Sequence, residues 1–259
     1  MASAREKQRI KSLAAEGQSV NTIKDKLGLP KSTVYYHFKK EVGQKQKENR
    51  LEIPDDPEFK EELCGIFAGD GNFHRDNDGH YRIRIFLNLN DEYWKILADH
   101  LEEKLSKRPR IYQYEDKTRE TLSYYSKALY LFLKQKLDWD KEKGASIRLK
   151  EVEELSEDFK IGFLRGFVDT DGHRYRDCRH YKMGSISGKL MNQISYILTD
   201  LGIDNSLTRS PDKRQNCRDM YRVKIYGDDA ESFGRDITPR HPKKDFENYY
   251  QEFNSLETV

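Results

Sequence analysis

Two aspartates, each followed by a glycine, end two apolar runs of similar composition. Asp70 stands near the end of LCGIFAGDG at 63–71, and Asp171 stands near the end of LRGFVDTDG at 164–172. Each run, with the charged residues before it, is long enough for a helix of about three turns, which the glycine can end in a left-handed conformation. An Asp at that end meets the negative pole of the helix dipole, so a cation should compensate it. Two such carboxylates together would form the oxygen-rich site that Mg²⁺ prefers.

The two aspartates belong to an internal duplication, in which residues recur 101 positions apart as Asp171 does after Asp70. Small residues in both runs would let two helices pack closely side by side around a pseudo-two-fold axis, which would bring both carboxylates to one end of the same seam. The recurring residues are Leu63, Gly65, Asp70, Gly71, Tyr125, Phe132 and Lys143, which return as Leu164, Gly166, Asp171, Gly172, Tyr226, Phe233 and Lys244. The small residues are Gly65, Ala68 and Gly69 in the first run and Gly166 and Thr170 in the second.

The two runs resemble the motif of the LAGLIDADG (DOD-type) homing endonucleases, and the resemblance covers nearly all of residues 57–250. It implies an α+β fold of tandem αββαββα repeats that form a pseudo-two-fold antiparallel β saddle, with one repeat at 57–145 and the other at 146–259. It also implies a site-specific endonuclease that cuts double-stranded DNA, as in intron homing. The sixth motif position, often Asp in the family, is Asp169 in the second run but Ala68 in the first.

The resemblance further implies which residues do the chemistry. Asp70 and Asp171 would bind the catalytic Mg²⁺ or Mn²⁺, assisted by the backbone carbonyls of Gly69 and Thr170. A metal ion can lower the pKa of a bound water and clamp a phosphate oxygen, as phosphodiester hydrolysis requires. A basic residue in each repeat would help the transition state. Lys143 and Lys244 share the 101-residue offset and are the predicted pair, although the neighbouring lysines at 141 and 243 compete for the role.

Alternating residues between the motifs predict strands whose basic side chains could face a duplex. The segment HYRIRIFLNLN at 80–90 is the clearest example of a half-buried strand. Phosphate and base contacts cannot be sorted from sequence, and a single Arg on a strand is often merely solvated. The predicted contacts of the two repeats are Arg75, Arg82, Arg84, Gln113, Lys117, Arg174, Arg176, Lys182, Arg209, Lys213, Arg222 and Lys224.

Residues 1–42 predict a separate helix-turn-helix DNA-binding domain, followed by a linker at 43–56. Ser19 can cap a second helix that stops at Gly28-Leu29-Pro30, and a third helix begins near Lys31. Val34, with Tyr35 or Phe38, would face the core of this domain. The alternative is a generic three-helix bundle with a solvated basic face. The N-terminal residues of the third helix would reach base edges in the major groove, and they are Lys31, Ser32, Thr33 and Tyr36.

Composition limits the other function classes. Residues 1–50 hold 12 Lys or Arg and 5 Asp or Glu, whereas the whole chain has a net charge of only +2. The excess of basic over acidic residues is therefore concentrated in the N-terminal fifth. Neither a signal peptide nor a membrane span is expected, and we predict a cytoplasmic, nucleoid-associated protein. The three cysteines show no C-x-x-C spacing, which indicates neither a disulfide framework nor a structural zinc site.

Other functions remain open at the level of sequence. A non-catalytic DNA-binding transcriptional regulator could have the same fold, although such regulators tend to lose the motif acids, and both are present here. A maturase that binds structured RNA during intron splicing is a third possibility. Because the duplication supplies both halves of the site, we expect the chain to act as a monomer.

Overall fold

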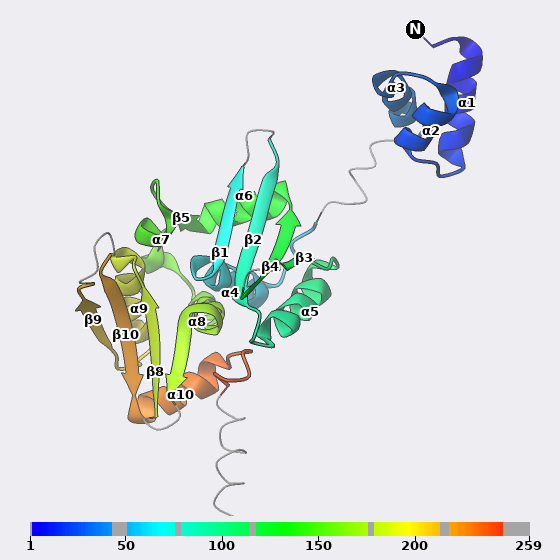
Figure 1. Cartoon of the computed structure of the whole chain (residues 1–259). Helices are drawn as coiled ribbons and strands as arrows, with labels where there is room; N and C mark the ends of the chain where they lie inside the picture. Colours follow the sequence, from blue (N-terminus) through cyan, green and yellow to red (C-terminus); the bar gives the residue numbers. More distant parts are fainter. Residues whose placement is uncertain are drawn as a thin grey trace, which may run out of the picture. The chain divides into compact units, whose positions relative to one another are not determined.

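The computed structural model of the chain describes residues 2–42, 51–75, 79–113, 118–175, 179–212 and 218–245. The chain divides into two compact units, Met1–Arg50 and Leu51–Val259 (Figure 1). No helix within these described ranges is long and apolar enough to cross a membrane.

The N-terminal unit consists of three helices, α1 (Ala4–Ala15), α2 (Val20–Leu27) and α3 (Lys31–Val42). Ser19 caps α2 by accepting a hydrogen bond from the amide of Thr22, and Gly28 ends α2 with a φ of 65°. The side chain of Phe38 is buried, while that of Tyr35 is 51% exposed. Phe38 is therefore the residue that packs with Val34 in the core of this unit. The core is small, and it comprises Ile10, Ala14, Ile23, Val34 and Phe38.

The larger unit contains two repeats with the same order of elements. The first is α4 (Pro57–Ala68), β1 (Gly71–Arg75), β2 (Tyr81–Asn88), α5 (Tyr93–Leu105), β3 (Arg110–Gln113), β4 (Arg119–Tyr125) and α6 (Lys127–Lys136). The second is α8 (Glu157–Asp171), β7 (Gly172–Tyr175), β8 (His180–Ser185), α9 (Gly188–Asp200), β9 (Ser206–Ser210), β10 (Met220–Tyr226) and α10 (Gly227–Ile237). Between them lie β5 (Leu137–Asp138), α7 (Lys143–Ser146), β6 (Arg148–Leu149) and a 3₁₀ turn (Val152–Glu154).

Each repeat forms one four-stranded antiparallel sheet, ordered β1-β2-β4-β3 in the first and β7-β8-β10-β9 in the second. Helices pack on the face of each sheet that carries its buried side chains, such as Ile83 and Ile85 of β2. The predicted α+β class, with two αββαββα repeats after a small helical unit, is confirmed.

The two motif helices α4 and α8 pack against each other at two glycines. A Cβ atom built on Gly65 would lie 2.1 Å from the carbonyl oxygen of Phe163, and one built on Gly166 would lie 2.1 Å from that of Glu62. Since Glu62 and Phe163 are also 101 residues apart in sequence, the two contacts are related by the repeat symmetry. The helices therefore approach as closely as the small residues predict.

The glycine after each aspartate has a different role from the predicted one. Gly71 and Gly172 are absent from the glycines with positive φ, and Gly172 is extended. A Cβ on Gly71 would lie 2.2 Å from Cδ1 of Phe67, and one on Gly172 would lie 2.4 Å from the carbonyl oxygen of Val168. The expectation of a left-handed helix end was wrong here, because the chain folds back over its own helix and leaves no room for a side chain.

Candidate functional site

The ends of α4 and α8 bring the two motif aspartates into one place. A Cβ atom on Gly69 would lie 2.2 Å from Oγ1 of Thr170 and 3.2 Å from Oδ2 of Asp171, so the two helix ends touch. Asp70 lies two residues after Ala68, the last residue of α4, and Asp171 is the last residue of α8. The predicted meeting of the carboxylates at one end of the seam thus follows from close helix packing.

Burial makes both carboxylates hard to ionise. Burial raises the pKa of Asp70, while the charges of Lys244 and Lys143 oppose the rise. Burial also raises the pKa of Asp171 to about 7, and the negative charge of Asp70 adds to the effect. A cation placed between the two carboxylates would favour their ionised forms and so oppose both effects.

The two predicted lysines lie at the aspartates, but their ammonium groups contact the backbone. Nζ of Lys143 donates to the carbonyls of Ala68 at 3.3 Å and Gly69 at 3.2 Å, and also to Gly71. Nζ of Lys244 donates to the carbonyls of Val168 at 3.0 Å, Asp169 at 2.8 Å and Thr170 at 3.3 Å. The contacts with Asp169 and Thr170 are equivalent to those of Lys143 with Ala68 and Gly69, whereas the third contact differs between the repeats. Burial lowers the pKa of both lysines to about 8.

The competing lysines at 141 and 243 are exposed and lie outside these contacts. Lys141 is exposed to solvent. The side chain of Lys243 is 65% exposed, and its Nζ lies 3.4 Å from Oδ2 of Asp91. The shared sequence offset therefore selected the two lysines that reach the motif helices.

The donor atoms at the seam fit a hard divalent cation. Carboxylate and carbonyl oxygens are the ligands that Mg²⁺ and Mn²⁺ accept, and Mg²⁺ commonly uses one or two carboxylates plus water and substrate phosphate. In the described part of the chain no three His, Cys, Asp or Glu side chains gather as a metal cluster. A metal bound by Asp70 and Asp171 would thus depend on oxygen ligands from outside the protein. The carbonyls of Gly69 and Thr170, the other predicted ligands, each accept from a lysine.

The sixth motif position has a structural role in the second repeat. The carboxylate of Asp169 is buried and accepts hydrogen bonds from the backbone amides of Arg240 at 3.1 Å and His241 at 3.0 Å. These contacts hold the segment 239–245, which follows α10 and which we call the strap. Because Asp169 fastens the strap, the alanine at position 68 of the first motif does not remove a metal ligand.

The strap crosses to the first repeat through charged residues that sequence reasoning missed. The guanidinium group of Arg240 donates to both carboxylate oxygens of Glu62, at 2.7 and 3.1 Å, and Glu62 is fully buried in α4. Nε2 of His241 lies 3.1 Å from Oδ2 of Asp91, and its ring stacks on Tyr93 with the centroids 4.8 Å apart. No local sequence signal links partners that are 150 or more positions apart.

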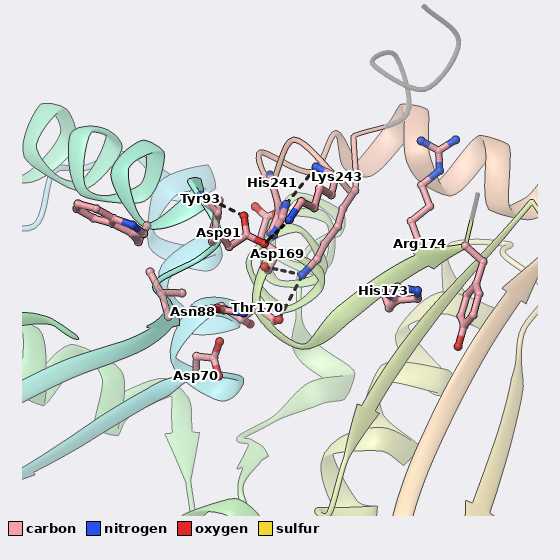
Figure 2. Close-up of a pocket in the computed structure, with 14 residues that line it drawn as sticks. Asp70, Asn88, Asp91, Tyr93, Asp169, Thr170, His173, Arg174, His241 and Lys243 are labelled. Atoms are coloured by element: carbon pink, nitrogen blue, oxygen red, sulfur yellow. Dashed lines mark hydrogen bonds and ion pairs between the residues drawn. The ribbon is translucent and has the colours of Figure 1, made fainter. Parts of the chain in front are cut away.

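A cavity of about 600 Å³ lies between the strap, the start of β7 and the end of β2 (Figure 2). Asp70 and Thr170 line it at the seam, and Asp91 and Lys243 line it near the strap. The cavity therefore connects one motif carboxylate to a region of mixed charge, and it is large enough for part of a nucleotide chain.

The strand register separates the predicted basic contacts into two groups. Side chains alternate between the two faces of a strand, so Arg82 and Arg84 lie on the face opposite the buried Ile83 and Ile85. The predicted residues on such open faces are Arg82, Arg84, Lys182, Arg222 and Lys224. Arg110 and Arg119 share the open face of the first sheet and were not among the predicted contacts.

Four predicted contacts fall on the other face. Gln113 pairs with Glu120, and Arg75 pairs with Tyr81, both at core-facing register positions. Nη1 of Arg174 donates to the carbonyl of Asp245 at 2.6 Å, and Nε of Arg209 donates to Oδ2 of Asp219 at 2.6 Å. These four share the strand parity of buried side chains, although Arg75 and Gln113 are exposed and the side chain of Arg209 is 64% exposed. Three further predicted contacts, Lys117, Arg176 and Lys213, lie outside the described residues.

The predicted contacts of the N-terminal unit lie along one side of α3. Lys31 and Ser32 are exposed, Thr33 is half-buried, and Tyr36 is 58% exposed. Two tyrosines and several lysines thus remain outside the small core of this unit.

Comparison with known proteins bears on the fold. Residues 158–238 match the family model of the LAGLIDADG-like domain. A curated relative, "Uncharacterized protein MJ0398" of Methanocaldococcus jannaschii, is 28% identical over 174 residues, which cover 63% of this chain and 59% of the relative. The chain thus matches less than two thirds of that relative's length.

Solved structures with the same fold include one endonuclease and one protein of another kind. The homing endonuclease I-DmoI, solved in complex with DNA and Mn, matches 70% of this chain and 96% of its own with a TM-score of 0.53 and 19% identity. Full-length DUF199/WhiA from "Thermatoga maritima" matches 82% of this chain and 70% of its own with a TM-score of 0.51 and 16% identity. The larger unit therefore resembles the double LAGLIDADG fold of I-DmoI, and residues 158–238 match the model of the LAGLIDADG-like domain.

Proposed function

We propose that this protein binds double-stranded DNA across its two sheets and hydrolyses one phosphodiester bond in each strand with Mg²⁺ or Mn²⁺ at Asp70 and Asp171. The observation that carries the proposal is the pair of half-buried carboxylates at the touching ends of α4 and α8. I-DmoI, which has this fold, was solved with DNA and with Mn, and this likeness supports the same substrate and cofactor here.

The residues of the chain divide the work of cleavage among them. Basic side chains on the open sheet faces, such as Arg84 and Arg222, hold phosphates and place one scissile bond on each side of the pseudo-two-fold axis. Asp70 and Asp171 would hold the cation, which would lower the pKa of a bound water and neutralise charge on the phosphate. Lys143 and Lys244 keep the helix ends and the carboxylates in place. Because the seam is poorly hydrated, its charges act on the phosphate more strongly than surface charges would.

The N-terminal unit would provide a second DNA contact. Its helix α3 presents Lys31, Ser32 and Tyr36 in the arrangement that helix-turn-helix proteins use in the major groove. Two linked modules on one duplex bind more tightly than either alone, because the second contact becomes intramolecular. We propose that this unit raises affinity and extends the recognised sequence, whereas the two repeats carry the cleavage chemistry.

A DNA-binding regulator without nuclease activity is the second candidate. The observation that favours it is the pair of buried lysines, since Lys143 and Lys244 place positive charge at the aspartates without any metal. Such a protein would keep its fold and its DNA contacts when no divalent ion is bound.

Cleavage of a randomised library of double-stranded DNA with Mg²⁺ distinguishes the two candidates. The wild type is compared with the double variant Asp70→Asn and Asp171→Asn, and with Asp236→Asn on the exposed surface of α10 as a matched control. The proposal predicts double-strand cuts at a defined sequence by the wild type and the control, and a loss of about a thousandfold or more in the double variant. Selective binding without cuts, unchanged in the double variant, would establish the regulator instead.

A further inference from the structure

The last carbonyl groups of both motif helices are occupied by lysines of the same chain. Carbonyls at a helix C-terminus have no partner within the helix, and an ammonium group has three N–H donors. Lys143 reaches the carbonyls of Ala68, at the end of α4, of Gly69, which follows it, and of Gly71, which begins β1. Lys244 reaches three carbonyls in the last turn of α8. Each ammonium thus sits in a ring of three backbone oxygens, which we call a carbonyl ring.

The same two lysines balance the charge of the seam. Two half-buried carboxylates and two helix C-termini concentrate negative charge where little water can reach. The positive charges of Lys143 and Lys244 favour ionised Asp70 and ionised Asp171, against the effect of burial. The buried carboxylate of Asp169 also acts on Lys244, and its charge is met by the backbone amides of Arg240 and His241 as well.

The backbone holds each lysine in position independently. Lys143 begins the short helix α7, and its carbonyl accepts a hydrogen bond from the amide of Ile147 at 2.8 Å. Lys244 lies in the strap, where its amide donates to the carbonyl of His241 at 2.8 Å and its carbonyl accepts from the hydroxyl of Tyr181 at 2.8 Å. Different anchors thus bring the same side chain to equivalent places in the two repeats.

We propose that Lys143 and Lys244 are built-in counter-cations: they fill the carbonyl rings, so the fold needs no divalent ion, and a metal at Asp70 or Asp171 takes its remaining ligands from water and substrate. Both lysines are positioning residues in this view and not groups that contact the phosphate. The inference rests on the proposed function only for the identity of the two metal-binding carboxylates.

The test measures Mn²⁺ binding and thermal unfolding without DNA. Lys143→Met and Lys244→Met, singly and together, are compared with the wild type and with Lys141→Met plus Lys243→Met, which removes the same charge from exposed neighbours. Loss of a ring lysine frees three carbonyl oxygens, so Mn²⁺ should bind at least tenfold more tightly, as followed by paramagnetic resonance of free Mn²⁺. The unfolding midpoint of these variants should rise by roughly 5 to 10 °C at about a hundredfold excess of Mn²⁺ over its Kd. The wild type and the control should rise by less than half as much.

Equal Mn²⁺ affinity in the wild type and the ring variants would overturn the inference, as would an equal rise in the control. If the double variant does not fold, the same comparison is made with Lys143→Met alone, since Lys143 is the less buried of the two. Neither readout involves cleavage. If the protein does not cut DNA but the variants differ in Mn²⁺ binding, the proposed function is wrong and the inference stands. If the protein cuts DNA but the variants bind Mn²⁺ equally, the inference is wrong and the proposed function stands.

Discussion

Burial sets the properties of the single residues at the seam. It is the first cause of the raised pKa of Asp171 and of the lowered pKa of both Lys143 and Lys244, ahead of any charged neighbour. Groups shielded from water interact more strongly with a charged ligand than the same groups at the surface. The reactivity proposed for this site therefore depends on the tightness of helix packing as much as on the identity of the acids.

His241 provides a prediction about pH. Its Nδ1 accepts a hydrogen bond from the amide of Lys243 at 3.2 Å, so the proton lies on Nε2 and is donated to Asp91. Burial, together with the charge of Lys244, lowers the pKa of this imidazole to about 4. In the unfolded chain His241 takes up a proton below about pH 6.5, whereas in the folded chain it does so only near pH 4. The free energy of unfolding therefore decreases as the pH falls from 6.5 towards 4. The loss due to His241 is on the order of 3 kcal/mol at pH 4.

The variant His241→Gln isolates this contribution. Glutamine keeps an N–H donor for Asp91 but does not titrate. Urea unfolding at pH 7 and at pH 4 should show a smaller loss of stability in the variant than in the wild type. An identical loss in both proteins would mean that His241 does not carry the effect.

At the scale of elements, contact between α4 and α8 decides whether the site forms. A Cβ atom on Gly65 would meet the backbone of α8, where nothing can move aside without separating the helices. Gly65→Ala should therefore cost about 2 kcal/mol or more, and it should also reduce cleavage by displacing Asp70. Urea unfolding and the cleavage assay measure the two effects.

Gly144 in α7 supplies the matched control. Its added Cβ would lie 3.4 Å from Cδ1 of Ile186, which is an ordinary contact at a helical position. Gly144→Ala should leave stability unchanged or raise it by about 0.5–1 kcal/mol. Equal destabilisation by the two substitutions would contradict close packing as the cause.

The elements of the larger unit could be predicted from sequence, whereas several contacts could not. Helical and strand periodicity, together with the repeat offset, indicated the order of elements and the meeting of Asp70 with Asp171. The partnership of Glu62 with Arg240 depends on how the end of one repeat lies across the other, which no periodicity records. The sequence also did not indicate which face of the sheet each strand residue lies on. A shift of one position in a strand would move residues such as Arg174 and Arg209 to the opposite face.

For the whole molecule, two separately packed units imply two separable contributions to DNA affinity. The N-terminal unit has an excess of basic over acidic residues, 12 against 5, and contains none of the acids at the seam. Lys31→Ala should weaken DNA binding and lower the slope of log affinity against log salt concentration by about 0.9, the value for one lost phosphate contact. The rate of cleavage at saturating DNA should not change.

Lys7→Ala on the exposed side of α1 is the control for this effect. It removes the same charge from the same unit at a site away from the proposed recognition helix. Binding titrations at several salt concentrations give the two slopes. Equal slopes for the two variants would show that α3 is not the DNA-contacting helix.

The strap also affects the order in which the chain can fold during its synthesis. The carboxylate of Glu62 is fully buried, and its guanidinium partner Arg240 is 178 residues later in the chain. Contacts at such sequence separation form late, and a chain growing from its N-terminus completes its first repeat long before Arg240 is made. The nascent first repeat therefore holds Glu62 with His100 beside it, Nε2 lying 3.5 Å from Oε2, but without the guanidinium group of Arg240. We expect the first repeat to remain incompletely folded, on the ribosome or bound by a chaperone, until the last part of the second repeat emerges and Arg240 can pair with Glu62.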